Sequence, residues 1–172
     1  TFEELGVSEE IRRAIEELGF VHPMPVQEEV IPYLLGNQND VIALAQTGTG
    51  KTAAFGIPVL QRIDPTSMET QALVLSPTRE LCLQIADDLK DFSKHMEGIH
   101  IVAVYGGASI ENQIRQLRHG AQIIVATPGR LIDLMNRGKA KLDKVYNVVL
   151  DEADEMLNMG FSESINAIFE GV

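Results

Sequence analysis

The sequence predicts an α/β fold in which a parallel β-sheet is covered by helices on both faces. Along most of the 172 residues, short apolar runs alternate with longer segments of helical periodicity, and this alternation is typical of βαβ units. Two strand ends also carry residues suited to ligands: a Gly/Thr-rich loop follows the first apolar run, and Asp151 with Glu152 follows the last. Because ligands of open α/β sheets bind beyond the carboxyl ends of the strands, both motifs support this architecture.

Two helices are predicted ahead of the sheet. Ser8, followed by two glutamates, is typical of a helix N-terminus, and this helix is expected to end near Gly19. Pro25 suits the first turn of a second helix that ends at Gly36.

The rest of the chain alternates between strands and helices. Strands are expected at 41–45, 72–76, 101–105, 122–126 and 147–150. Helices are expected at 51–62, 78–95, 110–118 and 128–137. Such an order predicts right-handed crossovers between parallel strands.

The first strand leads into a loop with the composition of a phosphate-binding site. Its glycines let the backbone point several N–H groups at phosphate oxygens, and the N-terminus of the next helix adds positive potential. Lys51 would reach the β- and γ-phosphates, and the Thr52 hydroxyl would bind Mg²⁺. The predicted nucleotide-binding residues of this loop are Ala45, Gln46, Thr47, Gly48, Thr49, Gly50, Lys51 and Thr52. The alternative is a Gly/Thr-rich turn before an ordinary helix.

A second motif, Asp151-Glu152-Ala153-Asp154, follows the last apolar strand. We expect Asp151 to hold Mg²⁺ through its water shell. Glu152 is the expected base or water-positioning group for attack on the γ-phosphate, and Lys51 completes the predicted catalytic set. The alternative is that these acids only stabilise the N-terminus of the following helix.

Three further strand ends carry residues suited to a chain of phosphates. Two predicted helices begin with a threonine and an arginine, so that backbone N–H groups, a hydroxyl and a guanidinium converge on one anion. A glycine doublet lets phosphates approach the backbone closely. The residues concerned are Pro77, Thr78, Arg79, Gly106, Gly107, Thr127, Gly129 and Arg130. The alternative is that threonine and proline simply begin a helix, and that Arg79 pairs with Glu80 or Asp87.

Taken in order along the chain, these motifs resemble the first RecA-like domain of a DEAD-box ATP-dependent RNA helicase, a P-loop NTPase. The resemblance extends from Phe2 to Phe161. It implies that the chain binds ATP and Mg²⁺, and that the three strand-end sites grip the backbone of single-stranded or duplex RNA without reading its sequence. It also implies that Asp154 couples this domain to a second RecA-like domain of the same protein.

Residues 19–27 resemble the Q motif of this family, which recognises adenine. The Gln27 amide offers a donor and an acceptor that suit the adenine amino group and N7. Phe2 can supply a stacking face, and Phe20 is also expected to contact the nucleotide. Met24 stands where the family usually has a small hydroxyl residue. We therefore divide one compact domain into a Q-motif region with the N-terminal helices, 1–36, and a RecA-like ATP-binding region, 37–172.

Composition agrees with one well-buried core, because 45% of the 172 residues are hydrophobic. The single cysteine, Cys82, excludes an internal disulfide, and the four histidines lack the spacing of metal ligands. The formal charge of −11 lacks the basic character typical of nucleic-acid binding, so we expect weak nonspecific affinity for RNA. No apolar run approaches the ~20 residues of a membrane span. We expect a cytoplasmic, monomeric protein without membrane contact.

The chain ends at Val172, before the Ser-Ala-Thr motif and the second RecA-like domain of the resembled family. That domain carries arginine fingers, so this chain is expected to bind nucleotide and hydrolyse it poorly. One hypothesis is an ATP-dependent RNA helicase of which this is the N-terminal half. The other is a nucleotide-gated RNA-binding or scaffold module that holds ATP without turnover.

The resemblance also predicts a strand order. In RecA-like folds, the strand leading to the Ser-Ala-Thr motif lies between the phosphate-loop strand and the acidic-motif strand. The chain stops before that strand, so we expect strands 41–45 and 147–150 not to pair directly. An empty slot would hold them about twice the usual ~4.8 Å apart.

Overall fold

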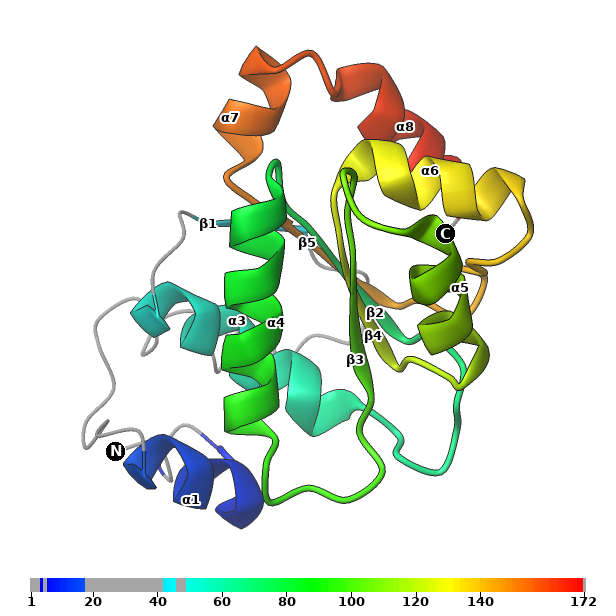
Figure 1. Ribbon diagram of the computed structural model, residues 1–172. Coiled ribbons are helices and arrows are strands. Elements are labelled where there is room, and N and C mark those ends of the chain that lie inside the picture. Colours follow the sequence, from blue (N-terminus) through cyan, green and yellow to red (C-terminus); the bar gives the residue numbers. More distant parts are fainter. Residues whose placement is uncertain (1–3, 5, 18–41, 46–48, 172) are drawn as a thin grey trace.

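The computed structural model describes residue 4 and residues 6–17, 42–45 and 49–171. Within this part of the chain, one five-stranded parallel sheet crosses the centre of the molecule (Figure 1). Its strands are β1 (Ile42–Ala45), β2 (Ala72–Leu75), β3 (Ile101–Val104), β4 (Ile123–Ala126) and β5 (Asn147–Asp151). The order across the sheet is β1-β5-β2-β4-β3.

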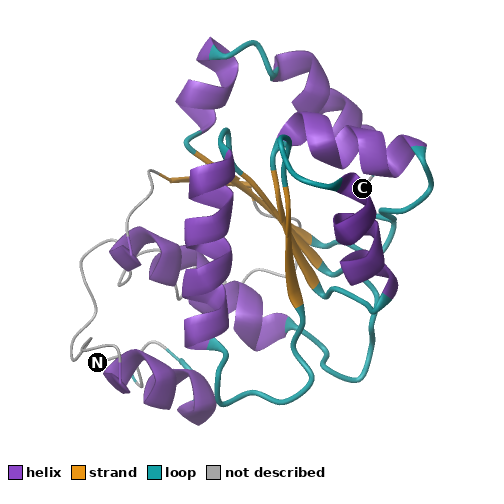
Figure 2. Cartoon of the chain, in the orientation of Figure 1, coloured by secondary structure: helices purple, strands orange, loops and turns teal. Residues whose placement is uncertain are grey.

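Helices pack on both sides of the sheet (Figure 2), as the sequence predicts. They are α1 (Glu9–Glu17), α3 (Thr49–Arg62), α4 (Arg79–Phe92), α5 (Ile110–Arg118), α6 (Pro128–Asn136), α7 (Ala153–Asn158) and α8 (Ser162–Glu170). The helix expected at 25–36 lies outside the described residues. None of the helices in the described part of the chain has the length and apolar character that a bilayer crossing requires.

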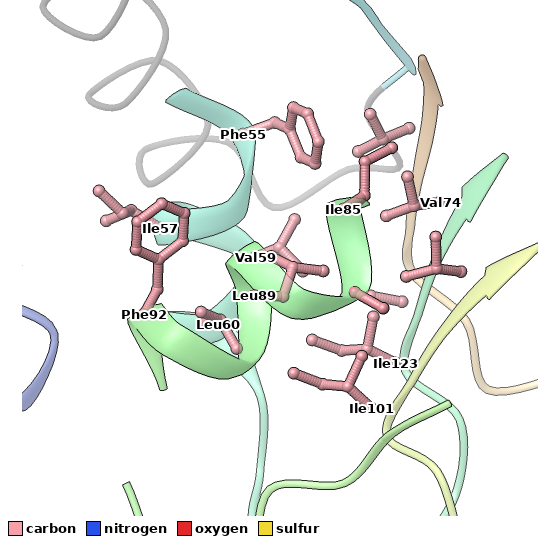
Figure 3. Close-up of a cluster of buried hydrophobic side chains, with 14 of the residues drawn as sticks. Phe55, Ile57, Val59, Leu60, Val74, Ile85, Leu89, Phe92, Ile101 and Ile123 are labelled. Carbon is pink, nitrogen blue, oxygen red and sulfur yellow. The ribbon is translucent and has the colours of Figure 1, made fainter. Parts of the chain in front are cut away.

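One face of the sheet is covered by α1, α3 and α4. Phe55 of α3 and Leu89 of α4 are buried together with Val74 of β2 and Ile123 of β4 (Figure 3). Successive side chains of a strand point to opposite faces, so Leu73, next to Val74, belongs to the core on the other side. Each large apolar side chain buried in this way stabilises the fold by about 1.5–3 kcal/mol.

The other face is covered by α5, α6 and α8 (Figure 1). Leu131 and Leu134 of α6 and Ile168 of α8 are fully buried against this side of the sheet, with Leu73 and Ile124. Both faces of every central strand are therefore apolar. This explains why the strands read as continuous apolar runs instead of alternating patterns.

The helix predicted at 78–95 is shorter in the structure and ends at Phe92. Thr78 caps its N-terminus by accepting a hydrogen bond from the Leu81 N–H at 3.2 Å. Ser93 is the C-cap residue of this helix, and Lys94 and His95, which follow it, both contact Glu17 of α1. These contacts, with that of Lys94 the larger, hold the pKa of Glu17 below its usual value.

The predicted strand order was wrong at one position. β1 pairs directly with β5 in parallel, with Ala43 opposite Val149 and Ala45 opposite Asp151. An empty slot would leave two rows of buried backbone groups unpaired, and each such group costs about 1–3 kcal/mol. Direct pairing removes this cost. Within the described residues, β5 therefore lies between β1 and β2.

Candidate functional site

The carboxyl ends of the strands, at the upper end of the sheet in Figure 1, carry the predicted site residues that the structure describes. The register of β1 and β5 places the end of the phosphate-loop strand, Ala45, opposite Asp151. The helix after the loop begins at Thr49, two residues earlier than predicted, so Thr49, Gly50 and Lys51 belong to its first turn. The loop and the acidic motif thus meet at neighbouring strand ends.

Several predicted nucleotide-binding residues lie outside the described part of the chain. These are Phe2, Phe20, Gln27, Gln46, Thr47 and Gly48. For Lys51 and Asp154, the structure gives the helix to which each belongs and not the side chain.

Thr52 and Asp151, the two predicted Mg²⁺ ligands, are both buried, with 1% of each residue exposed. Asp151 also lies close to Cys82 of α4. Burial, and secondarily the charge of Asp151, raises the pKa of the Cys82 thiol to about 12. A thiol with so high a pKa is protonated at neutral pH, as expected of a buried structural cysteine.

Glu152 has a backbone conformation that is rare for a residue with a side chain. Its φ of 55° and ψ of 48° lie in the left-handed region, and it is the only residue other than glycine with positive φ in the described part of the chain. This conformation costs about 1–2 kcal/mol. Glu152 precedes α7, yet its side chain makes no capping hydrogen bond. Glu152 therefore does not cap α7 through a side-chain hydrogen bond.

Asp88 is a buried charged residue that the sequence-based predictions missed. Only 8% of Asp88 is exposed, and burial raises the pKa of its carboxyl group. Hydrogen bonds from Gln84, at 3.2 Å, and from the Thr52 hydroxyl partly offset this shift. α4 thereby contacts the end of the phosphate loop. An aspartate next to Leu89, on the apolar face of a predicted helix, was the signal in the sequence.

Most of the predicted RNA-binding residues line one pocket of about 460 Å³. The residues that line it are Pro77, Arg79, Gly106, Thr127, Gly129, Arg130, Asp133 and Phe161. Asp133 and Phe161 were not predicted to belong to this site. Of the remaining predicted residues, Thr78 serves as the N-cap of α4, and Gly107 adjoins the pocket with a φ of +82°.

Arg79 is exposed and does not pair with Glu80 or Asp87 within the described structure, so the ion pairs considered as an alternative are not formed. Its guanidinium instead lies 5.2 Å from the centre of the Tyr105 ring. A cation above an aromatic face is stabilised by the ring quadrupole. Tyr105 is thus a further residue of this site that the sequence-based predictions did not include.

Arg130 is held by the turn that follows β3 and by α5. Its Nη1 atom donates to the Ala108 carbonyl oxygen at 3.2 Å and to Gln113 Oε1 at 2.9 Å. Gln113 is only 4% exposed. A glutamine among the apolar positions of 110–118 was the signal that could have marked it.

Comparison with known proteins agrees with this geometry. Residues 24–172 match the DEAD/DEAH box helicase family. Over 98% of its length, the chain is 53% identical to the ATP-dependent RNA helicase DeaD of Escherichia coli K12, of which it covers 27%. It is 51% identical over its whole length to the DEAD-box ATP-dependent RNA helicase CshA of Geobacillus kaustophilus, of which it covers 36%. The chain thus spans about a third or less of these relatives.

Solved structures of similar sequence share the fold. A DEAD box protein from Methanococcus jannaschii superimposes with a TM-score of 0.90 at 42% identity, over 99% of this chain and 46% of that one. A hypothetical ATP-dependent RNA helicase from Sulfolobus tokodaii gives a TM-score of 0.84 at 40% identity, over 96% of this chain and 47% of that one. Motifs, fold and sequence identity agree, and the chain belongs to the DEAD/DEAH box helicase family.

Proposed function

We propose that the protein containing this chain is an ATP-dependent RNA helicase, and that the chain supplies its nucleotide site and part of its RNA track. The observation that carries this proposal is the pocket of about 460 Å³ at the strand ends, where Arg79, Gly106 and Arg130 converge. It lies at the same edge of the sheet as the acidic motif.

The nucleotide site would use the phosphate loop and the acidic motif together. Lys51 and the N–H groups at the start of α3 would bind the phosphates. The buried oxygens of Thr52 and Asp151 suit Mg²⁺, which prefers oxygen ligands and keeps several waters. Bound Mg²⁺ would neutralise charge that develops on the phosphates. The strained backbone of Glu152 supports a functional role for this residue, such as orienting the attacking water.

The RNA track would bind phosphates one after another along the strand ends. The N-terminus of α4 and the guanidiniums of Arg79 and Arg130 supply positive potential inside an acidic molecule. Gly106 supports this role for a steric reason. A Cβ atom added there would meet no protein atom within 4 Å, so nothing inside the described structure requires glycine at this position. A ligand backbone that approaches closely would require it.

The remaining expectations extend this proposal. Gln27, Phe2 and Phe20 would contact the base of ATP, and the division at residue 36 would separate this region from the RecA-like ATP-binding part. Asp154 would couple the chain to a second RecA-like domain, in a monomeric cytoplasmic protein. The relatives are longer than this chain, which is consistent with a further domain.

The test is RNA-stimulated ATP hydrolysis by the complete protein, with labelled oligouridine as the RNA. Arg79→Ala should weaken RNA binding about tenfold and leave the affinity for ATP unchanged, because it removes one charge-assisted phosphate contact. Lys51→Ala should weaken ATP binding. Arg115→Ala, an exposed arginine on α5 outside the pocket, is the matched control. ATP and RNA binding without RNA-stimulated turnover would instead favour the scaffold module.

A further inference from the structure

Gln113 of α5 reaches back to the end of β3 and binds the backbone of Tyr105 with both ends of its amide. Its Oε1 accepts a hydrogen bond from the Tyr105 N–H at 3.3 Å, and its Nε2 donates to the Tyr105 carbonyl oxygen at 3.1 Å. The orientation of this amide follows from its partners. Tyr105 N–H and Arg130 Nη1 are both donors, so the oxygen must face them and the nitrogen must face the carbonyl group.

The same oxygen of Gln113 also holds Arg130. The Arg130 Nη1 atom donates one hydrogen to Gln113 Oε1, at 2.9 Å, and the other to the Ala108 carbonyl oxygen, at 3.2 Å. A guanidinium carries five N–H donors in one rigid plane. Among the described residues, the three on Nη2 and Nε have no partner, and they remain for a ligand in the pocket that Arg130 lines.

Tyr105 connects this arrangement to the other arginine. Gln113 fixes its backbone, and its ring lies beneath the Arg79 guanidinium, with the cation 5.2 Å from the ring centre. The buried amide of Gln113 thus restrains Arg130 by a direct hydrogen bond, and it restrains Arg79 indirectly, through Tyr105. Long side chains that are ordered before a ligand arrives lose less conformational entropy on binding.

We propose that Gln113 is a positioning residue of the RNA track, which makes Arg79 and Arg130 bind one ribose-phosphate chain as a unit. The inference rests on the RNA-binding function proposed above. It assigns a role to a buried glutamine that would otherwise be a structural residue.

The test uses the complete protein and labelled oligouridine. Gln113→Leu keeps the approximate volume and removes both polar ends, so Arg79 and Arg130 should lose their shared restraint. We expect RNA affinity to fall about tenfold with no change in ATP affinity. Gln116→Leu, on the exposed side of the same helix, is the matched control and should change neither quantity.

A double-mutant cycle separates positioning from simple loss of stability. In the protein with Gln113, Arg79→Ala and Arg130→Ala should be non-additive in RNA affinity by about threefold or more. With Gln113→Leu as the background, the two effects should become additive. Equal coupling in both backgrounds, or unchanged RNA affinity of Gln113→Leu, would overturn the inference.

Gln113→Glu provides a second variant in case the leucine variant does not fold. Its carboxylate can still accept from Arg130 Nη1, and it neutralises this arginine. The salt slope of RNA binding should then fall by about 0.7, and adding Arg130→Ala should lower it no further. A full second decrease would contradict the proposed contact. Absence of RNA binding by the unaltered protein would instead refute the proposed function, and this inference with it.

Discussion

At the scale of single residues, the residues at the carboxyl ends of the strands differ in burial between the two predicted sites. Thr52, Asp151 and Cys82 are buried beside the predicted phosphate site, whereas Arg79 and Gly106 are exposed beside the predicted RNA track. Burial sharpens electrostatic effects because low-dielectric surroundings screen them weakly.

Cys82 should resist alkylation in the folded protein. Its pKa is raised from 9.0 to about 12, so the reactive thiolate at pH 8 should be about a thousandfold less abundant than in the unfolded chain. Because the folded pKa is the higher one, the linked stability is present below about pH 9 and is lost as the pH rises toward 12. Mass spectrometry after iodoacetamide treatment, with and without urea, measures this. Rapid modification of the folded protein would contradict it.

The two glycines at the end of β3 should differ when replaced. Gly106→Ala should leave the free energy of unfolding within about 0.5 kcal/mol of the original, since surface changes without a strained backbone have small effects. It should weaken RNA binding severalfold, because the new methyl group faces the pocket. Gly107→Ala should destabilise the protein by about 1 kcal/mol or more, because its φ of +82° strains any other residue. Urea unfolding and RNA titration test both variants.

At the scale of elements, buried amides connect segments that helices and strands alone do not join. Gln113 joins α5 to the end of β3. At the opposite end of the sheet Gln122, just before β4, joins the loop that contains Ser67 to the loop before β3. Gln122 is fully buried. Its Oε1 accepts from the His100 N–H at 2.7 Å, and its Nε2 donates to the carbonyl oxygens of Gly98, at 2.7 Å, and Ser67, at 3.2 Å. One side chain therefore orders two loops.

Gln122→Leu should destabilise the fold by about 2–4 kcal/mol, because it removes three part-buried hydrogen bonds to loop backbone groups, at about 0.5–1.5 kcal/mol each. Gln116→Leu is the control, since that glutamine is exposed. Chemical unfolding monitored by circular dichroism measures the difference. Equal stability of the two variants would show that water replaces the Gln122 contacts without loss.

At the scale of the whole molecule, one sheet separates two apolar cores, and β2, β3, β4 and β5 each contribute to both. The pairing of β1 with β5 makes this sheet continuous from edge to edge. Both cores should therefore unfold in one cooperative transition of the 172-residue chain.

Leu89→Ala and Leu134→Ala test this cooperativity, because they open cavities on opposite faces of the sheet. Each should lower the free energy of unfolding by about 2–5 kcal/mol. The double variant should show the sum within about 0.5 kcal/mol, since the two sites share no contacts. Calorimetry of the single and double variants provides the measurement. Two separate heat-absorption peaks would mean that the cores unfold independently.

The positions of most elements could be read from the sequence because they depend on local patterns, whereas α8 was not predicted. The strand predictions differ from the observed strands by a residue at an end, and the predicted helix 110–118 has the observed bounds. Apolar runs and helix-starting residues act within a few neighbours along the chain. The motif residues at strand ends were predictable for the same reason, and parallel pairing then brings all such ends to one edge.

Contacts between segments that are distant in the sequence could be identified only from the three-dimensional structure. The pairing of β1 with β5 depends on which strand edges are available, and no local pattern records this. Gln113 and Asp88 stand out in the sequence only as polar residues at apolar helix positions, and Tyr105 does not stand out. Their roles arise from the groups that packing places beside them. Hydrogen bonds and burial act over distances of a few ångströms in space. The chain reveals such neighbours only after it has folded.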